Sequence, residues 1–304
     1  MGEGDGDAPG PAPGRRRRVS SRRALLYVVA VLAVLNSFWP LVVMALAGYG
    51  IDLAPLFSGK AVSYVAGVPF YSGGIFPSPY YYLFSIFVLG FPRMMLNSFV
   101  IASISIAIAM GVGVPVGYIL ARVDIRGRTL VAYLLLALRA ASPFIVIVPL
   151  FVTYSSIGLY DTYPGVALAE EMLVLAVVVW MLKGFFEDIP REVYDAATVF
   201  CKSEWQVFTR VAMRLVLPGV VVTALFAFVL VWNEFLISET LTGAATKTVA
   251  VGVWSGIGET TGVVKSFGWD DLNAAGTLAF VPAVAVMLAI RRYLARGFSL
   301  GQAR

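Results

Sequence analysis

The sequence EVYDAATVFCKSEWQVFTRVAMRLVLPG, residues 192–219, is the only long amphipathic segment of this chain, and it lies between two strongly hydrophobic segments. Just before it stands Pro190, which favours the first turn of a helix. Apolar residues then recur at helical spacing and predict one apolar face, made of Val193, Ala196, Ala197 and Phe200. Ser203 followed by Gln206 is a capping-box pattern, so we expect a second short helix to start there.

The two predicted helices have the properties of a docking site. The second helix carries apolar residues on one side, namely Trp205, Phe208, Ala212 and Leu215. The pair Ala196 and Ala197 presents almost no side chain, which lets the backbone of a partner approach closely. The charged residues Glu192, Asp195 and Lys202 remain at the rim. The alternative interpretation is an ordinary loop that connects two membrane spans.

The composition of the chain places it in a bilayer. Its residues are 59% hydrophobic and only 13% charged, with a mean hydropathy of +0.84, whereas about a quarter of a soluble domain is charged. A helix needs about 20 mainly apolar residues to cross a membrane. Six segments meet this condition, at residues 24–48, 96–120, 130–154, 163–182, 215–237 and 272–290. The apolar run at residues 80–91 is too short to cross, and its three tyrosines favour the membrane–water interface.

The distribution of Lys and Arg predicts the orientation, because these residues are retained on the cytoplasmic side. With both ends inside, 18 of the 23 basic residues fall in inner segments, four fall in outer segments, and Arg139 lies within a span. This order predicts a disordered basic tail at residues 1–23, a cytoplasmic loop at 184–214 and a cytoplasmic tail at 295–304. The net charge of +5 therefore reflects membrane topology and gives no sign of nucleic-acid binding. The run Arg15–Arg18 can contact anionic lipid headgroups.

Several features argue against an enzyme and against a metal or cofactor site. The chain has no histidine and a single cysteine, Cys201, so the commonest general base and zinc ligands are missing. The sequence from Gly258 to Ser266 superficially resembles a phosphate-binding loop, but its lysine does not follow the second glycine directly. ATP hydrolysis would therefore belong to a separate subunit.

The glycines Gly113 and Gly117 predict a smooth helix surface for close packing.

Polar residues inside predicted spans mark a candidate substrate path, because ionisable groups in a bilayer are costly and usually face water or a partner. Glu170 and Glu171 lie in the outer part of the fourth span, where one of them would line the path and the other would pair with a neighbouring chain or with Arg139. Arg139, close to Pro143, is alternatively a structural anchor where the third span bends. Near the outer end of the fifth span, the run Trp232-Asn233-Glu234 offers the groups that a sugar site uses. It is equally consistent with an interfacial tryptophan and polar neighbours that reach water.

The amphipathic segment resembles the EAA loop of the membrane permeases of ABC transporters. The matching residues are Asp195-Ala196-Ala197, Ser203, Trp205-Gln206, Phe208 and Pro218-Gly219. Two positions depart from the family pattern, since Cys201 stands where a glycine is usual and Arg214 where an earlier proline is common. A cysteine at a turn with positive φ would be strained. The resemblance implies that an ATPase subunit docks on this loop, on the residues Glu192, Val193, Asp195, Ala196, Ala197, Phe200, Cys201, Ser203, Trp205 and Phe208.

Three further stretches resemble the second permease subunit of maltose-type carbohydrate importers: FFEDIPREVYDAA at 185–197, WNEF at 232–235 and the tail at 292–301. The resemblance implies an all-α integral membrane subunit with the type I importer architecture and no cofactor. Its partners would be a second permease subunit, two copies of an ATPase and an extracytoplasmic sugar-binding protein. A permease for amino acids, peptides or phosphate is the nearest alternative. An ion-coupled secondary transporter is a further alternative, but it would be expected to show internal repeats, and the sequence has no clear repeat.

Overall fold

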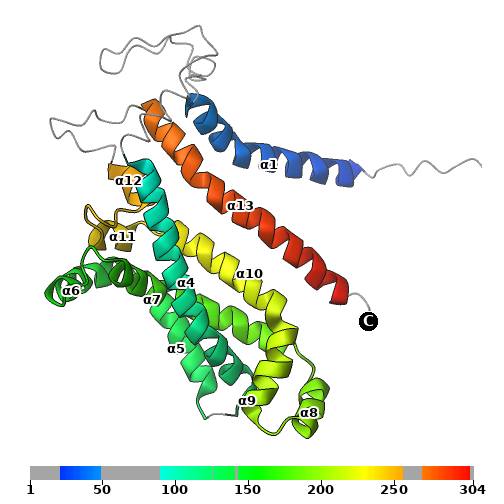
Figure 1. Cartoon of the computed structure of the whole chain (residues 1–304). Coiled ribbons are helices and arrows are strands. Elements are labelled where there is room, and N and C mark those ends of the chain that lie inside the picture. Colours follow the sequence, from blue (N-terminus) through cyan, green and yellow to red (C-terminus); the bar gives the residue numbers. More distant parts are fainter. Residues whose placement is uncertain (1–20, 49–89, 125, 141–142, 256–268, 302–304) are drawn as a thin grey trace, which may run out of the picture. The chain divides into compact units, whose positions relative to one another are not determined.

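The computed structural model describes residues 21–48, 90–124, 126–140, 143–255 and 269–301, and this part of the chain is helical without strands. Figure 1 shows the arrangement of the elements. In chain order they are α1 (Ser21–Gly48), α4 (Phe91–Arg122), α5 (Arg128–Ala140), α6 (Pro143–Ser156), α7 (Tyr163–Glu187), α8 (Arg191–Phe200), α9 (Glu204–Gln206), the π-helical turn η1 (Val207–Ala212), α10 (Met213–Trp232), α11 (Leu236–Leu241), α12 (Val249–Ser255) and α13 (Trp269–Gly301). The prediction of an all-α protein is confirmed.

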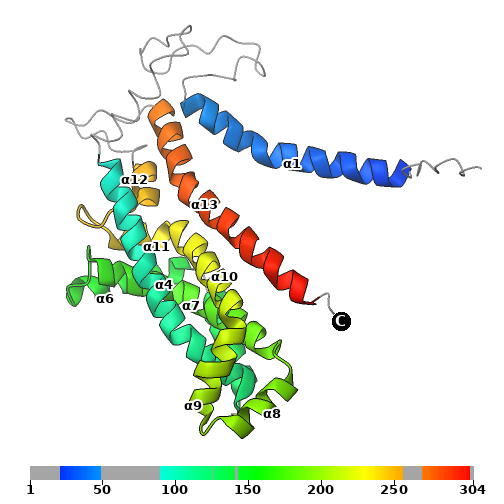
Figure 2. The same ribbon diagram turned by 45° about the vertical axis from the view of Figure 1, so that its right-hand side comes forward.

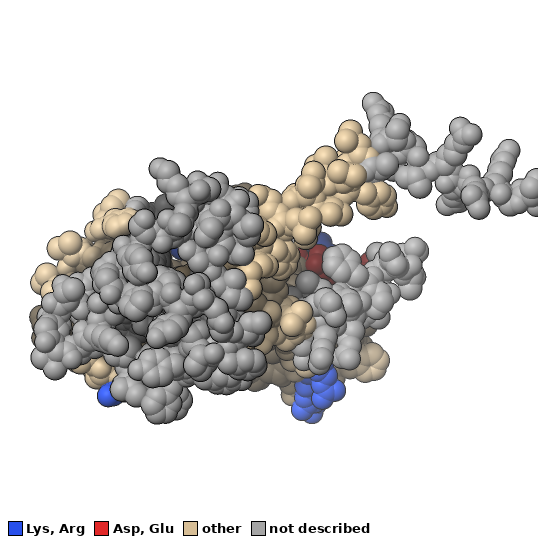
Figure 3. Space-filling view, turned by 90° about the horizontal axis from the view of Figure 1, so that it is seen from above, with Lys and Arg blue, Asp and Glu red and all other residues tan. Residues whose placement is uncertain are grey.

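Helices that could cross a membrane occur where the sequence predicts them. The segments Leu25–Leu46, Phe91–Arg122, Tyr163–Glu187 and Glu204–Trp232 are long and apolar enough to span a bilayer. The shorter apolar helices of the described residues are Arg128–Ala137, Pro143–Ser156 and Asn273–Ala289. In Figure 3, the visible described surface consists mostly of uncharged residues, with a few Lys, Arg, Asp and Glu side chains. Such a chain is a multi-pass membrane protein, while the count of six spans stays a prediction.

The boundary between the two compact units of the chain falls within helix α1, between Val43 and Met44, and the other helices belong to the second unit. Several predicted features lie outside the described residues: the basic tail up to residue 20, most of the outer loop 49–95, the interfacial tyrosines at 80–82, the sequence 258–266 and the last three residues of the C-terminal tail.

Helices α4 and α7 pack closely because two glycines of α4 leave room for α7. A Cβ atom added at Gly113 would lie 2.6 Å from Cγ1 of Val178, and one at Gly117 would lie 2.9 Å from Cβ of Leu182. Both distances are shorter than van der Waals contact, so only glycine permits this approach. The prediction that these glycines serve helix packing is confirmed. The core between α4, α7 and α10 is filled by residues such as Val178, Leu182 and Val216.

Two predicted spans are divided in the structure. The third, expected as one segment at 130–154, consists of the separate helices α5 and α6, with α6 beginning at Pro143. A proline lacks the amide hydrogen that would continue a helix and disfavours helical geometry in the residue before it. The fifth, expected at 215–237, ends at Trp232, and the chain then starts the short helix α11. The sixth predicted span is part of helix α13, which continues through the predicted tail as far as Gly301.

The amphipathic segment forms one separate helix and one extension of a long helix. Helix α8 follows Pro190, and its end at Cys201 has φ −101° and ψ 136°, so the strain expected from a positive φ does not arise. Ser203 accepts a hydrogen bond from the Gln206 amide at 3.4 Å and caps the next helix, as predicted. That helix is not an independent short helix, because α9, η1 and α10 run on without a break from Glu204 to Trp232. Figures 1 and 2 show α8 and α9 at one end of the bundle and α11 and α12 at the other.

Candidate functional site

The docking segment, which we define as residues 191–212, exposes large apolar side chains next to a long apolar helix. Phe200 is 86% exposed, Val199 80% and Trp205 66%. They lie at the end of α8 and the start of α9, where the chain turns between the two helices. A group of exposed large apolar side chains on a predicted cytoplasmic segment indicates a protein contact surface.

The structure divides the predicted docking residues into two sets. Glu192, Val193, Asp195, Ala196, Ser203, Trp205 and Phe200 are exposed, and Cys201 is half-buried. Ala197 and Phe208 are instead only 7% exposed and belong to the protein's own interior. Ala197 packs against its own chain, so a direct contact of its side chain with a partner stays a prediction that the burial does not favour.

An aromatic cluster holds the docking segment against the bundle. The Tyr118 ring of α4 lies 4.8 Å from the ring of Phe208 and 5.4 Å from the ring of Phe186, with the latter pair edge to face. It also lies 6.3 Å from the ring of Tyr194, on α8. Ring pairs at such separations add about 0.5–1.5 kcal/mol each beyond the area that they bury. The cluster joins α4, the end of α7, α8 and η1.

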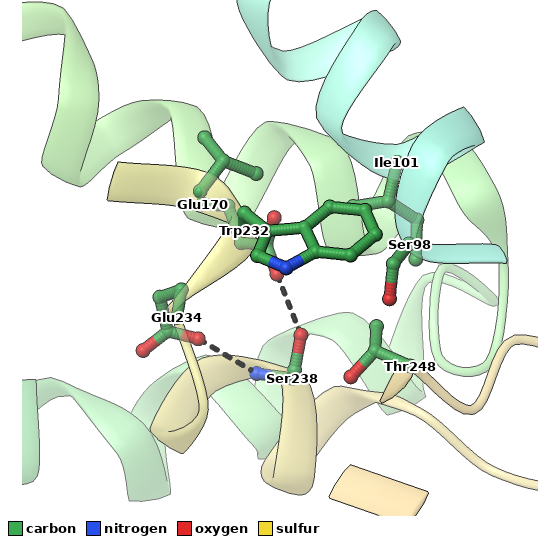
Figure 4. A pocket seen from close by; sticks show the side chains of 8 residues that line it. Ser98, Ile101, Glu170, Trp232, Glu234, Ser238 and Thr248 are labelled. Carbon is green, nitrogen blue, oxygen red and sulfur yellow. Dashed lines mark hydrogen bonds between the residues drawn. The ribbon is translucent and has the colours of Figure 1, made fainter. Parts of the chain in front are cut away.

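A small polar pocket lies at the opposite end of the bundle, between α4, α7, α10 and α11 (Figure 4). Glu170 is only 1% exposed, and its Oε1 accepts a hydrogen bond from the Ser238 hydroxyl at 2.6 Å. Its Oε2 has no hydrogen-bond partner among the described residues. The rest of the lining comes from Ser98, Ile101, Val231, Trp232, Glu234 and Thr248.

Glu234 caps helix α11. Its two carboxylate oxygens accept hydrogen bonds from the amides of Leu236, Ile237 and Ser238 at 3.0–3.1 Å. The first amides of a helix have no partner within the helix, so a carboxylate at this place stabilises it. This structural role accounts for a polar residue that the sequence assigned to the substrate path.

Trp232 faces the interior of the protein. It is 6% exposed, its ring stacks on Phe228 with centroids 5.3 Å apart, and its indole N–H donates to the carbonyl of Ala279 at 3.0 Å. It is therefore neither an open face for a sugar ring nor an interfacial anchor. Asn233 is exposed, and its amide donates to the Val229 carbonyl at 2.7 Å. Glu171 is half-buried.

Arg139 has a different neighbour from the one expected. It has no carboxylate within 4 Å among the described residues, where the ion pairs are Arg128 with Asp124 and Lys183 with Glu187. It is close enough to Glu234 for an electrostatic interaction. The expected ion pair of Arg139 with Glu170 or Glu171 is therefore not formed within the described part of this chain.

Three residues that sequence analysis missed organise the segment between α11 and α12. Asn97 donates to the carbonyls of Ala245 and Lys247 at 3.1 and 2.9 Å. Ser98 accepts a hydrogen bond from the Val249 amide at 2.8 Å. The partners of both residues lie about 150 positions away in the sequence, and no local pattern points to them.

Asp161 is the third of these residues and holds the same segment from the loop before α7. Its carboxylate accepts hydrogen bonds from the amides of Gly243, Ala245 and Thr246 and from the Thr246 hydroxyl, at 2.6–3.1 Å. Burial raises the pKa of the Asp161 carboxyl, but these hydrogen bonds outweigh that effect and hold the pKa below its ordinary value of 3.8. The carboxylate therefore stabilises the fold in its charged form.

Replacing Asp161 by asparagine is expected to destabilise the protein by about 1–3 kcal/mol, because an amide NH₂ would face backbone donors. A carboxyl group whose pKa is lowered in the folded protein contributes its full stabilisation at pH values above its ordinary pKa. It loses this stabilisation as the pH falls through the lowered pKa of the folded state. The difference in thermal stability between the wild type and Asp161→Asn should thus be present at neutral pH and shrink below about pH 4. Asp124→Asn is the control, because Asp124 is exposed and its one ion pair among the described residues is with Arg128. A difference that stays constant down to acid pH would contradict the charged role.

Comparison with known proteins gives a consistent set of relatives. The family model described as "Binding-protein-dependent transport system inner membrane component" matches residues 113–300. The chain is 30% identical over 212 residues to a diacetylchitobiose uptake system permease protein of Streptomyces coelicolor, covering 70% of each chain. It is 25% identical over 282 residues to a trehalose/maltose transport system permease protein of Thermococcus litoralis, covering 92% of this chain and 96% of that protein. The fold is shared with a chain in the crystal structure of a bacterial ABC transporter involved in the import of alginate, with a TM-score of 0.68. The similarity covers 93% of this chain and 99% of that one, at 16% sequence identity.

Proposed function

Because this chain belongs to the family of binding-protein-dependent transport system inner membrane components, we propose that it is the second type of permease subunit in an ATP-driven importer of sugars or short oligosaccharides. The observation that carries the sugar class is the match to carbohydrate permeases over most of their length, including 96% of the trehalose/maltose protein. The exposed apolar side chains of residues 191–212, which run directly into a long apolar helix, support this proposal.

The proposed partners are an ATPase, a second permease subunit and an extracytoplasmic binding protein. It is a transport subunit whose energy comes from ATP hydrolysed by a separate ATPase subunit, present in two copies, that docks on residues 191–212. Phe200 and Trp205 give this surface its apolar contact area. A second permease subunit would complete the transport path, and an extracytoplasmic binding protein would deliver the sugar. The proposed orientation keeps both ends of the chain in the cytoplasm.

The substrate path needs polar groups that remain accessible. Glu171 is half-buried and Asn233 is exposed, so we place the transported sugar beside these two residues. Glu170, Trp232 and Glu234 support the same region from inside the protein, because each is engaged with the chain's own groups. Glu171→Gln is therefore expected to change transport affinity or rate at normal membrane abundance. Glu170→Gln makes the same change at the buried neighbouring residue and serves as the comparison.

The direct test is uptake of labelled disaccharides and short oligosaccharides by proteoliposomes that contain this subunit with its permease partner, its ATPase and its binding protein. Uptake should require ATP and should stop in a complex whose ATPase cannot hydrolyse ATP. It should persist when ion gradients are dissipated, which would separate this mechanism from an ion-coupled transporter. Uptake of amino acids, peptides or phosphate in place of every sugar tested would refute the substrate class and leave the transporter class intact.

A further inference from the structure

The last residue of α4, Arg122, binds the end of α7 through its guanidinium group. Nε and Nη2 donate to the carbonyl of Phe186 at 3.0 and 2.6 Å, and Nη2 also donates to the carbonyls of Glu187, at 3.3 Å, and Ile189. The last carbonyls of a helix have no partner within it and carry partial negative charge. No carboxylate lies within 4 Å of Arg122 among the described residues, so its charge is directed at this helix end.

The same guanidinium group lies over the ring of Tyr194, with Cζ 4.0 Å from the ring centroid. Tyr194 lies on α8 and is half-buried, whereas the end of α8 is exposed at Val199 and Phe200. One side chain therefore contacts both the end of α7 and helix α8. Arginine suits this place because it combines planar stacking with several fixed donors, which lysine lacks.

Building on the proposed function, we infer that Arg122 is a positioning residue that makes the docking helix α8 and the spanning helix α4 move as one unit. An ATPase that displaces Phe200 and its neighbours also displaces Tyr194, because both belong to the same short helix. The stack on Arg122 passes that displacement to the end of α4 and to the end of α7. Helix α4 in turn carries Asn97 and Ser98, which hold the segment between α11 and α12 at the far end of the bundle.

Arg122→Gln should uncouple ATP hydrolysis from transport without preventing docking. The variant is expected at near-normal membrane abundance and should co-purify with the ATPase, while solute transported per ATP hydrolysed falls by about tenfold. Tyr194→Leu should give the same defect, and Tyr194→Phe, which keeps the ring, should not. Because both residues act through one contact, the double variant should be no worse than either single one. Arg128→Gln is the matched control, since the one ion pair of Arg128 within the described part of the chain is with the exposed Asp124.

A second measurement follows the two helices directly and does not depend on which solute is carried. Spin labels are placed at the exposed positions Ile119 on α4 and Thr198 on α8, in a Cys201→Ser background of the complete complex. The distance between the labels should be narrowly distributed in the wild type and in Arg128→Gln, with or without ATP and vanadate. In Arg122→Gln the distribution should be broader and should shift with nucleotide.

A narrow, unchanged distance in Arg122→Gln would overturn the inference. The inference would also be overturned if transport fell only in proportion to the membrane abundance of the variant. Arg122 would then act only as a structural cap of α7. If the wild-type complex carried no sugar, the proposed substrate class would fail, but the spin-label distances would still decide the role of Arg122.

Discussion

Replacing Gly117 by valine is expected to remove most of the folded protein from the membrane. The new Cβ would lie 2.9 Å from Cβ of Leu182 and 3.2 Å from the backbone nitrogen of Lys183. Backbone atoms of a packed helix cannot move aside, so α4 and α7 would have to separate. Overpacking of this kind costs about 1–3 kcal/mol for one or two methyl groups, and occasionally more. The measurement is membrane abundance together with the thermal unfolding temperature of the purified subunit complex.

Gly111 on the same helix provides the matched control. A Cβ atom added there meets nothing within 4 Å, so Gly111→Val makes the same chemical change without the clash. Gly111→Val should therefore keep near-normal abundance. Equal losses in Gly111→Val and Gly117→Val would mean that both act through helix propensity or insertion, and not through the contact between α4 and α7.

Replacing Phe200 by aspartate should abolish association with the ATPase while the permease still folds. The side chain is 86% exposed, so this chain loses little packing when it is changed. A partner that covers it would instead have to bury a charge where an aromatic ring was. Large apolar residues at the centre of an interface contribute about 2 kcal/mol or more to binding, or roughly a thirtyfold change in affinity. Co-purification of the ATPase, ATP hydrolysis and uptake should all fall together.

Two other substitutions show whether the effect belongs to the docking surface. Ala197→Asp should reduce membrane abundance as well, because Ala197 is buried in its own chain and an unpaired charge there opposes folding. Thr129→Asp adds the same charge at an exposed position near the start of α5, outside residues 191–212, and should leave ATPase association unchanged. If Phe200→Asp retains the ATPase and normal uptake, residues 191–212 are not the docking site and the partner assignment loses its main support.

The helical character of the chain and the location of its long apolar helices could be predicted, because both depend on local properties of the sequence. Apolar length indicates a membrane helix, and the spacing of Gly113 and Gly117 indicates a close helix contact, whichever helix supplies the other side. The cap at Ser203 was equally local. The interruptions at Pro143 and after Trp232 were harder to place, because continuous hydrophobicity does not reveal where a helix stops.

The candidate site was predicted only in part. Helical spacing identifies an apolar face on α8, but it does not say whether the chain itself or a partner covers each position. The structure buries Ala197 and Phe208 and leaves Val199, Phe200 and Trp205 exposed. Likewise, Trp232 and Glu234 have the side chains of a sugar site, yet one donates to α13 and the other caps α11.

The sequence by itself determined that this is an all-helical membrane protein with an amphipathic segment between two apolar ones, since hydropathy and helical period are properties of neighbouring residues. Only the tertiary structure decided which polar side chains remain accessible and which hold the fold. Asp161 meets Thr246, Asn97 meets Lys247, and Arg122 meets the end of α7, across separations of 64 to 150 residues. A hydrogen bond needs its two atoms within about 3 Å, and for such distant residues that condition is met only after the helices have packed.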